Sequence, residues 1–230
     1  MGKYFNEKVI PKIMKFINTK GVQAIKDGMI YSMPLLIVGS FFLILSNFPI
    51  QAVVDFLEAT GIKSVLDQAY GATFNISAMI AVIGISYNYV KAEGQEPLGG
   101  AMVALGTFIL LMPSSVTTES GEVVSGVINK TWTAGQGMIG ALIIGLVVGF
   151  VYSWFLKKDI RIKMPQGVPA GVSNAFSALL PGACIILAAT VAHGIASLGF
   201  HTTVMDAIYD VIQTPLQGMT DSLGGAMLMC

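Results

Sequence analysis

Charged residues are scarce in this chain of 230 residues. Only 11% of them are Asp, Glu, Lys or Arg, whereas a soluble domain has about 25%. Thirteen basic residues balance thirteen acidic ones, so the net charge gives no reason to expect a nucleic-acid partner. Hydrophobic residues make up 54% of the chain, and the mean hydropathy is +0.73. The composition excludes an ordinary soluble domain and predicts an all-α polytopic membrane protein.

Cysteine and catalytic motifs are equally sparse. The two cysteines, Cys184 and Cys230, have neither the spacing of a metal site nor that of a disulfide framework. The sequence contains no HExxH motif, no glycine-rich phosphate loop after a strand and no Ser–His–acid grouping. A lone histidine in or beside an apolar run, such as His193 or His201, is more often a packing residue than a catalyst. We therefore expect no catalytic residue, no metal site and no cofactor within this chain.

Long runs without Asp, Glu, Lys or Arg mark the candidate membrane spans, because a helix needs about 20 apolar residues to cross the hydrocarbon core. The five predicted spans are Gly28–Phe48, Tyr70–Val90, Leu98–Met112, Gly135–Leu156 and Ala175–Phe200. Gly145 and Gly149 form a GxxxG pair, which predicts close helix packing. Since no charged residue lies inside the spans, an ion-coupled carrier receives little support.

The segments outside the spans are predicted to lie at the membrane surfaces. In residues 1–27, apolar residues recur at helical spacing opposite several lysines, which is typical of a basic helix that meets anionic lipid headgroups. Gln51–Asp67 is amphipathic and is expected to lie along the outer surface. Pro113–Lys130 is expected to form a short external hairpin, because two β-prone runs flank a Ser-Gly turn.

Basic residues are concentrated in two segments. Six lysines precede Asp27, and four basic residues lie between Lys157 and Lys163, so the two segments hold ten of the thirteen. The positive-inside rule assigns both segments to the cytoplasm. A cytoplasmic N-terminus followed by four spans also returns Lys157–Lys163 to the inside. The number of helices and the charge bias therefore predict the same orientation.

Polar side chains in or beside the spans are the candidates for ligand contact. A sugar hydroxyl needs amide or backbone partners inside an otherwise apolar site. The residues of this kind are Asn75, Ser77, Gln136, Ser173 and Asn174. Each of them could instead form a hydrogen bond with a neighbouring helix.

Four segments together resemble a known family. They are QAIKDGMIYSMPLLIVGSFFLIL (Gln23–Leu45), ISYNYVKAEGQEPLGGAMVAL (Ile85–Leu105), MPQGVPAGVSNAFSALLPG (Met164–Gly182) and TPLQGMTDSLGGAML (Thr214–Leu228). The chain is similar to enzyme IIC, the membrane component of the bacterial phosphoenolpyruvate sugar phosphotransferase system, in its lactose, cellobiose and diacetylchitobiose branch. The third segment is the most specific. In it, Pro169 is expected to begin the fifth helix, and Pro181 with Gly182 to kink or interrupt that helix.

The resemblance implies that residues 1–230 form a single membrane domain, the N-terminal half of an enzyme IIC-like transporter. Residues 1–27 would be a cytoplasmic amphipathic segment and residues 28–200 the five spans. Residues 201–230 would hold an external amphipathic segment and the start of the next span. Relatives are nearly twice as long, and their second half carries the catalytic histidine and glutamate. Whether this chain takes part in an enzymatic reaction is therefore left open.

The resemblance also implies a function. The relative accepts a β-linked disaccharide such as cellobiose from outside and exposes its 6-hydroxyl to phosphorylated enzyme IIB. It works as a homodimer surrounded by membrane lipid, in the inner (plasma) membrane of a bacterium, with the N-terminus in the cytoplasm. Asn75 and Asn174 are the predicted substrate-binding residues, because both amides lie where the two halves of such a transporter would meet. The alternative is a truncated dimerisation scaffold that transports nothing.

Overall fold

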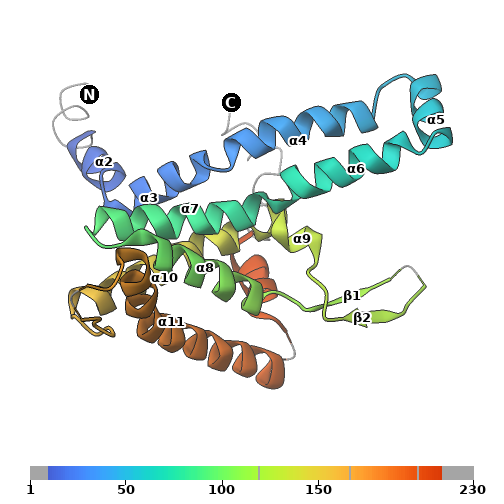
Figure 1. Cartoon of the computed structure of the whole chain (residues 1–230). Coiled ribbons are helices and arrows are strands. Elements are labelled where there is room, and N and C mark those ends of the chain that lie inside the picture. Colours follow the sequence, from blue (N-terminus) through green and yellow to red (C-terminus); the bar gives the residue numbers. More distant parts are fainter. Residues whose placement is uncertain (1–9, 119, 166, 201, 214–230) are drawn as a thin grey trace.

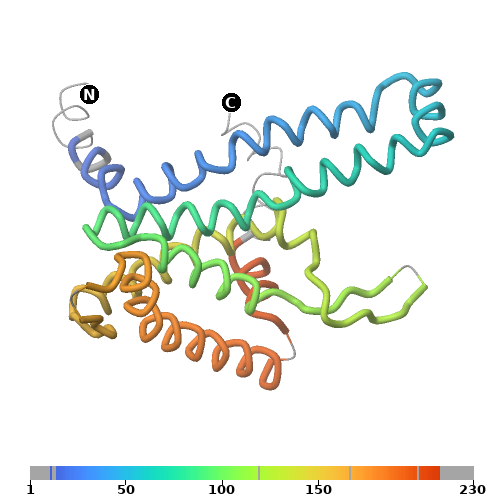
Figure 2. The backbone as a smooth tube through the Cα atoms, in the orientation of Figure 1, coloured from blue at the N-terminus to red at the C-terminus, as the bar shows by residue number. Residues whose placement is uncertain are grey.

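The computed structural model describes residues 10–118, 120–165, 167–200 and 202–213. Helices dominate this part of the chain, and most of them run side by side in a bundle (Figure 1). The tube in Figure 2 shows that the blue-to-cyan helices and the yellow-green strands both extend away from the bundle on the same side. The predictions for residues 1–9, His201 and 214–230, with Cys230 among them, lie outside the described residues.

The first long apolar stretch is made of two helices. After α2 (Ile10–Ile17), helices α3 (Lys20–Ile30) and α4 (Met33–Ser46) together form a 27-residue stretch that is long and apolar enough to cross a membrane. This stretch begins earlier than the predicted span, because residues 20–27 belong to the helix α3. Ala24 and Gly28 of α3 are buried, so packing extends the span toward the N-terminus.

The second stretch is longer than the predicted span Tyr70–Val90. Helix α6 (Ile62–Thr73), the 3₁₀ turn η2 (Phe74–Ile76) and α7 (Ser77–Ala92) form a continuous run of 31 residues. The expected surface segment Gln51–Asp67 comprises α5 (Gln51–Ala59) and the first residues of α6.

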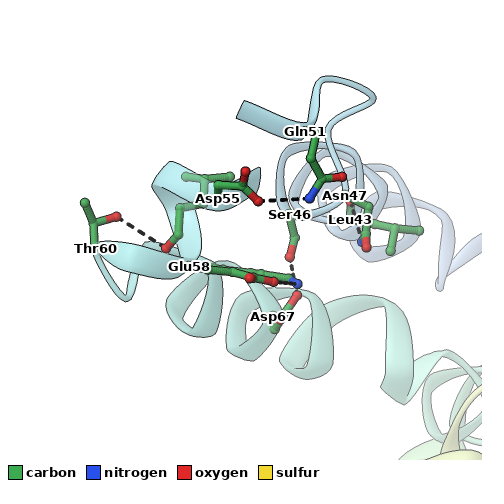
Figure 3. A network of polar contacts seen from close by, with 10 residues as sticks. Leu43, Ser46, Asn47, Gln51, Asp55, Glu58, Thr60 and Asp67 are labelled. Carbon is green, nitrogen blue, oxygen red and sulfur yellow. Dashed lines mark hydrogen bonds and ion pairs between the residues drawn. The ribbon is translucent and has the colours of Figure 1, made fainter. Parts of the chain in front are cut away.

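Helices α4, α5 and α6 form an arm whose tip holds a network of polar contacts (Figure 3). The hydroxyl of the buried Ser46 donates a hydrogen bond to Asp67, which joins α4 to α6. Gln51 Nε2 donates to Asp55 Oδ1 over 2.9 Å in the first turn of α5. These contacts tie the tip together where the chain reverses direction.

The third predicted span corresponds to a shorter helix. Helix α8 (Pro97–Leu111) has 15 residues, about 22 Å at 1.5 Å per residue, while a spanning helix needs about 17–25 residues. The structure has four helical stretches long and apolar enough to cross a membrane within the residues it describes. The count of five spans therefore remains a prediction.

Two short strands lie in the segment where a hairpin is expected. Strands β1 (Ser115–Thr117) and β2 (Val123–Ser125) pair antiparallel, with Val116 opposite Val124. Their position on the outer side of the membrane remains a prediction.

The fourth predicted span corresponds to a long helix. The short helix α9 (Lys130–Thr133) and the 3₁₀ turn η3 (Gly135–Gly137) precede α10 (Met138–Lys157). Residues Gly135–Lys157 form a candidate span of 23 residues, close to the predicted Gly135–Leu156.

The last long helix, α11 (Ala170–Gly194), continues into the π-helical turn η4 (Ile195–Gly199), and the two form a candidate span of 30 residues. Helix α12 (Val204–Ile208) and the turn η5 (Tyr209–Gln213) follow.

Of the kink or interruption predicted at Pro181, the interruption is wrong, because α11 runs through that residue without a break. The kink remains a prediction. Pro169 does precede the first turn, as expected. Pro181 is buried, and a Cβ added at Gly182 would lie 3.0 Å from Val103 Cγ2 of α8. Proline removes the backbone bond to the carbonyl four residues earlier, but packing against α8 holds the rest of the helix together.

Helix α7 lies at the centre of the bundle, with α3, α8 and α10 packed around it. A Cβ added at Gly28 of α3 would lie only 2.4 Å from the backbone nitrogen of Ile85. Cβ atoms added at Gly145 and Gly149 of α10 would each lie 3.0 Å from a Cβ of α7. The glycine pair read from the sequence therefore lies at a close helix contact.

Candidate functional site

A cavity of about 610 Å³ lies between α8 and α11. This volume is typical of small-molecule sites, which measure about 300–1,000 Å³. The residues that line it are Glu96, Leu98, Gly99, Met102, Val103, Gly171, Asn174, Ala175, Ala178, Leu179, Gly182, Ala183 and Ile186. The wall is mainly apolar, and its polar side chains are those of Glu96 and Asn174.

Both walls of the cavity start at the same end of the bundle (Figure 1). Glu96 precedes α8 in an extended conformation, and Pro97 begins the helix, where its missing N–H costs nothing. Pro169 is the N-cap residue of α11, directly before its first turn. The two helix starts thus bring the carboxylate of Glu96 and the amide of Asn174 to one cavity.

Tyr152 of α10 supports the cavity wall from behind. Its side chain is 1% exposed, and a Cβ added at Gly99 would lie 2.2 Å from its hydroxyl oxygen and 2.7 Å from Ala178 Cβ. Only a glycine at position 99 leaves room for the tyrosine between α8 and α11. Glu96 and Tyr152 were not predicted as site residues.

The structure does not bring the two predicted substrate-binding residues to one cavity. Asn174 lines the α8–α11 cavity, whereas Asn75 is not among the lining residues. Asn75 lies in η2, where its backbone oxygen accepts a hydrogen bond of 2.5 Å from Thr133 Oγ1. Ser173 is adjacent to Asn174 in the chain but does not line the cavity.

Two other predicted polar residues lie at the junction that contains Asn75. Ser77 is buried at the start of α7, and Gln136 is exposed in η3. The turns η2 and η3 contact α9 and α7 respectively, so two interrupted helical stretches meet there. The five polar candidates therefore divide between a cavity and a helix junction.

His193 lies in the last turn of α11, immediately before the π-helical turn. Its Nδ1 atom is buried and has no hydrogen-bond partner among the residues that the structure describes. Those residues contain no group of three or more His, Cys, Asp or Glu side chains that could hold a metal ion.

Comparison with known proteins gives a consistent result. Residues 26–230 match the family described as "Phosphotransferase system, EIIC". The lichenan permease IIC component of Bacillus subtilis (strain 168) is 32% identical over 238 residues, which cover 99% of this chain and 52% of that protein. The cellobiose-specific EIIC component of the PTS system of Geobacillus stearothermophilus is 31% identical, with coverages of 98% and 51%.

A solved structure is similar over the same length. The transporter ChbC, the IIC component from the N,N'-diacetylchitobiose-specific phosphotransferase system, matches with a TM-score of 0.88 at 31% identity. The match covers 98% of this chain and 54% of ChbC. The chain thus spans about half the length of the relatives it matches.

Proposed function

Because the chain belongs to the phosphotransferase system EIIC family, we propose that it forms part of a sugar permease that delivers its substrate for phosphorylation. The match over residues 26–230 carries this proposal. The agreement with ChbC, at a TM-score of 0.88, supports it independently, because it concerns the arrangement of the helices.

The proposed substrate is a β-linked disaccharide similar to cellobiose. The names of the relatives above refer to lichenan, cellobiose and N,N'-diacetylchitobiose. The sugar units of all three compounds are joined by β-linkages. In the proposed reaction, enzyme IIB donates a phosphoryl group to the 6-hydroxyl of the sugar. The charged product cannot recross the bilayer, so phosphorylation makes the uptake irreversible.

In this proposal the α8–α11 cavity is part of the wall along which the sugar moves. The apolar side chains contact the faces of the sugar rings. The amide of Asn174 donates to and accepts from hydroxyl groups, and the carboxylate of Glu96 accepts from them. Asn174 has the stronger support because it lines a cavity. Asn75 is a second proposed contact, at the η2 junction, for another position of the sugar along its path.

The proposal extends to the partners and the orientation of the chain. Enzyme IIB works on the cytoplasmic side, to which the basic segments and the N-terminus are assigned. The surface we propose for contact in a homodimer is the apolar outer face of α4, where Ile37, Phe41 and Ile44 are 70%, 59% and 60% exposed. A protein that stays monomeric in lipid bilayers would contradict the dimer.

Sugar phosphorylation by membranes that contain the protein tests the proposed function. When these membranes are supplied with phosphorylated enzyme IIB and labelled cellobiose, they should form labelled cellobiose phosphate. If they phosphorylate no β-glucoside under these conditions, the proposal is refuted.

Calorimetric binding of cellobiose tests the role of the cavity. Asn174→Ala should weaken binding about tenfold, the loss expected for one hydrogen bond in a water-poor site. Ser173→Ala is the matched control, because Ser173 is adjacent in sequence and outside the cavity. Equal affinities of the two variants for cellobiose would show that Asn174 does not contact the sugar.

The alternative of a non-transporting scaffold gains no support from the relatives named above, which are permeases, EIIC components and a transporter.

A further inference from the structure

One carboxylate joins the ends of three candidate spans. Lys20 begins the α3–α4 span, Glu93 directly follows the α6–α7 span, and Lys157 ends the α10 span. Lys20 Nζ lies 2.7 Å from Glu93 Oε2, and Lys157 Nζ binds the same oxygen. The three helix ends are therefore at one level, at the boundary between the apolar spans and the polar surroundings.

The cluster of Lys20, Glu93 and Lys157 carries one positive charge in excess. Glu93 is mostly shielded, with its side chain 10% exposed, while those of Lys20 and Lys157 are 54% and 47% exposed. The pKa of Glu93 is lowered by the hydrogen bond from Lys157 and then by that from Lys20, so the carboxylate is charged at neutral pH.

The ammonium groups of Lys20 and Lys157 lie close together, and each has N–H donors that the bond to Glu93 does not use. Each has three N–H donors. Because both bind one oxygen, through bonds of at most about 2.9 Å, their nitrogens lie no more than about 6 Å apart. This spacing allows two oxygens of one phosphate group to contact both lysines.

An apolar stripe runs from this cluster into the span. Trp154, Phe150 and Val147 of α10 recur on one side of the helix and are 45%, 57% and 55% exposed. A crevice of about 70 Å³ connects the stripe to the charges; Tyr89, Glu93, Phe150, Ser153, Trp154 and Lys157 line it. Tryptophan is enriched at the membrane interface, where its ring lies at the level of the headgroups.

We propose that this cluster and stripe form a binding site for an anionic phospholipid. The phosphodiester lies between the ammonium groups of Lys20 and Lys157, and an acyl chain follows Trp154, Phe150 and Val147. A phosphodiester carries one negative charge, which matches the excess of the cluster. A soluble phosphate would contact only the lysines, whereas a single phospholipid contacts both the lysines and the stripe.

Quenching of Trp154 fluorescence by brominated lipids tests this site. The other tryptophan, Trp132, is replaced by phenylalanine, so that Trp154 alone emits. The protein is placed in phosphatidylcholine bilayers that contain the same small fraction of brominated phosphatidylglycerol or of brominated phosphatidylcholine. Brominated phosphatidylglycerol should be enriched at Trp154 about fivefold, the effect expected for one lysine near an anionic lipid.

The variants separate a specific site from general attraction. Lys157→Gln should bring the two quenching efficiencies close to equality, whereas Lys157→Arg, which keeps the charge and the contact with Glu93, should retain most of the preference. Lys163→Gln is the matched control, because Lys163 binds Asp159 in the loop that follows α10 and is not at the crevice. Lys163→Gln should leave the preference unchanged.

Three outcomes would overturn the proposal. Equal quenching by both brominated lipids in the parent protein would show that no anionic lipid is selected. Loss of the preference on adding millimolar glycerol phosphate would identify a site for a soluble phosphate. Weaker binding of phosphorylated enzyme IIB to Lys157→Gln, with unchanged lipid preference, would make the cluster a protein contact.

Discussion

At the scale of single residues, Glu93 illustrates how a charge is accommodated at the end of a membrane span. Two lysines from different helices bind one of its oxygens, and the chain places the carboxylate immediately after α7. The charge-assisted hydrogen bonds from the two lysines stabilise the ionised form of the Glu93 carboxylate and so lower the pKa of Glu93. The stability of the fold should therefore depend on the ionisation of Glu93.

The replacement Glu93→Gln should lower the thermal midpoint at pH 7 by about 2–6 °C. A carboxylate whose pKa is lower in the folded than in the unfolded state stabilises the fold above the unfolded pKa of about 4.3. That contribution is lost as the pH falls through the lowered folded pKa. Melting curves of parent and variant should thus converge on acidification. Glu122→Gln, at an exposed residue beside β2, serves as the control, and a constant difference across the pH range would contradict the assignment.

Asn174 was predicted as a sugar contact because its amide lies where the two halves of an enzyme IIC-like transporter would meet, and the structure places it in the wall of the cavity. The sequence could not identify Glu96 and Tyr152 in the same way. Glu96 lies just outside the apolar run of α8, and it belongs to the site only because α11 packs beside that helix. Tyr152 reaches the wall only because position 99 is glycine. Such roles depend on contacts between helices that are distant in the sequence.

At the scale of elements, the junction of η2 and α9 shows how interrupted helices remain stable inside the bundle. The break between α6 and α7 frees backbone groups, and the carbonyl of Asn75 accepts the hydroxyl of the buried Thr133 over 2.5 Å. In an apolar environment each unpaired carbonyl is costly, so a side chain from another element must satisfy it.

The variant Thr133→Val keeps the shape of the side chain but removes this hydrogen bond. It should lower the free energy of unfolding by about 1 kcal/mol, the typical net contribution of one hydrogen bond. Chemical denaturation in detergent measures the change. Thr131→Val, at an exposed position of the same short helix, should have almost no effect; equal losses for both variants would argue against the role of Thr133.

The contact between α3 and α7 depends on glycine at position 28. A Cβ there would lie 2.4 Å from the backbone of Ile85, which cannot move aside as a flexible side chain can. Gly28→Ala should therefore destabilise the protein by about 2–3 kcal/mol. Gly194→Ala is the control, because nothing lies within 4 Å of its added Cβ. A Gly28→Ala protein as stable as this control would mean that α3 and α7 are not packed this closely.

Hydropathy was sufficient to locate the long helices, because a run of about 20 apolar residues has few alternatives to a spanning helix. It was less informative about their ends. Residues 20–27 carry two lysines and one aspartate, yet they continue the helix because Ala24 and Gly28 pack in the bundle. The prediction of an interruption at Pro181 was wrong for a related reason. The effect of a proline on a helix depends on the packing around it, and α11 packs against α8 at this point.

At the scale of the whole molecule, the starts of α8 and α11 and the ends of α7 and α10 lie together (Figure 1). The arm of α4, α5 and α6 and the strands β1 and β2 extend away from this end (Figure 2). Lys20 and Lys157 meet at this end. Lys158, Arg161 and Lys163 follow the end of α10, so the arrangement agrees with one surface of a membrane.

Cysteine labelling in intact cells can test the orientation. In a background with Cys184 and Cys230 replaced by alanine, Ser120→Cys in the hairpin should react with a membrane-impermeant maleimide added outside. Lys158→Cys, after α10, should react only once the membrane is permeabilised. The reverse pattern would invert the proposed topology, and labelling of both sites in intact cells would indicate that the reagent had entered.

The single oxygen shared by Lys20 and Lys157 has a mechanical consequence. If α3, α7 or α10 slid along its axis by one helical turn, about 5.4 Å, at least one of the two ion pairs would have to break. The shared oxygen therefore opposes independent sliding of the three helices and keeps their ends in register.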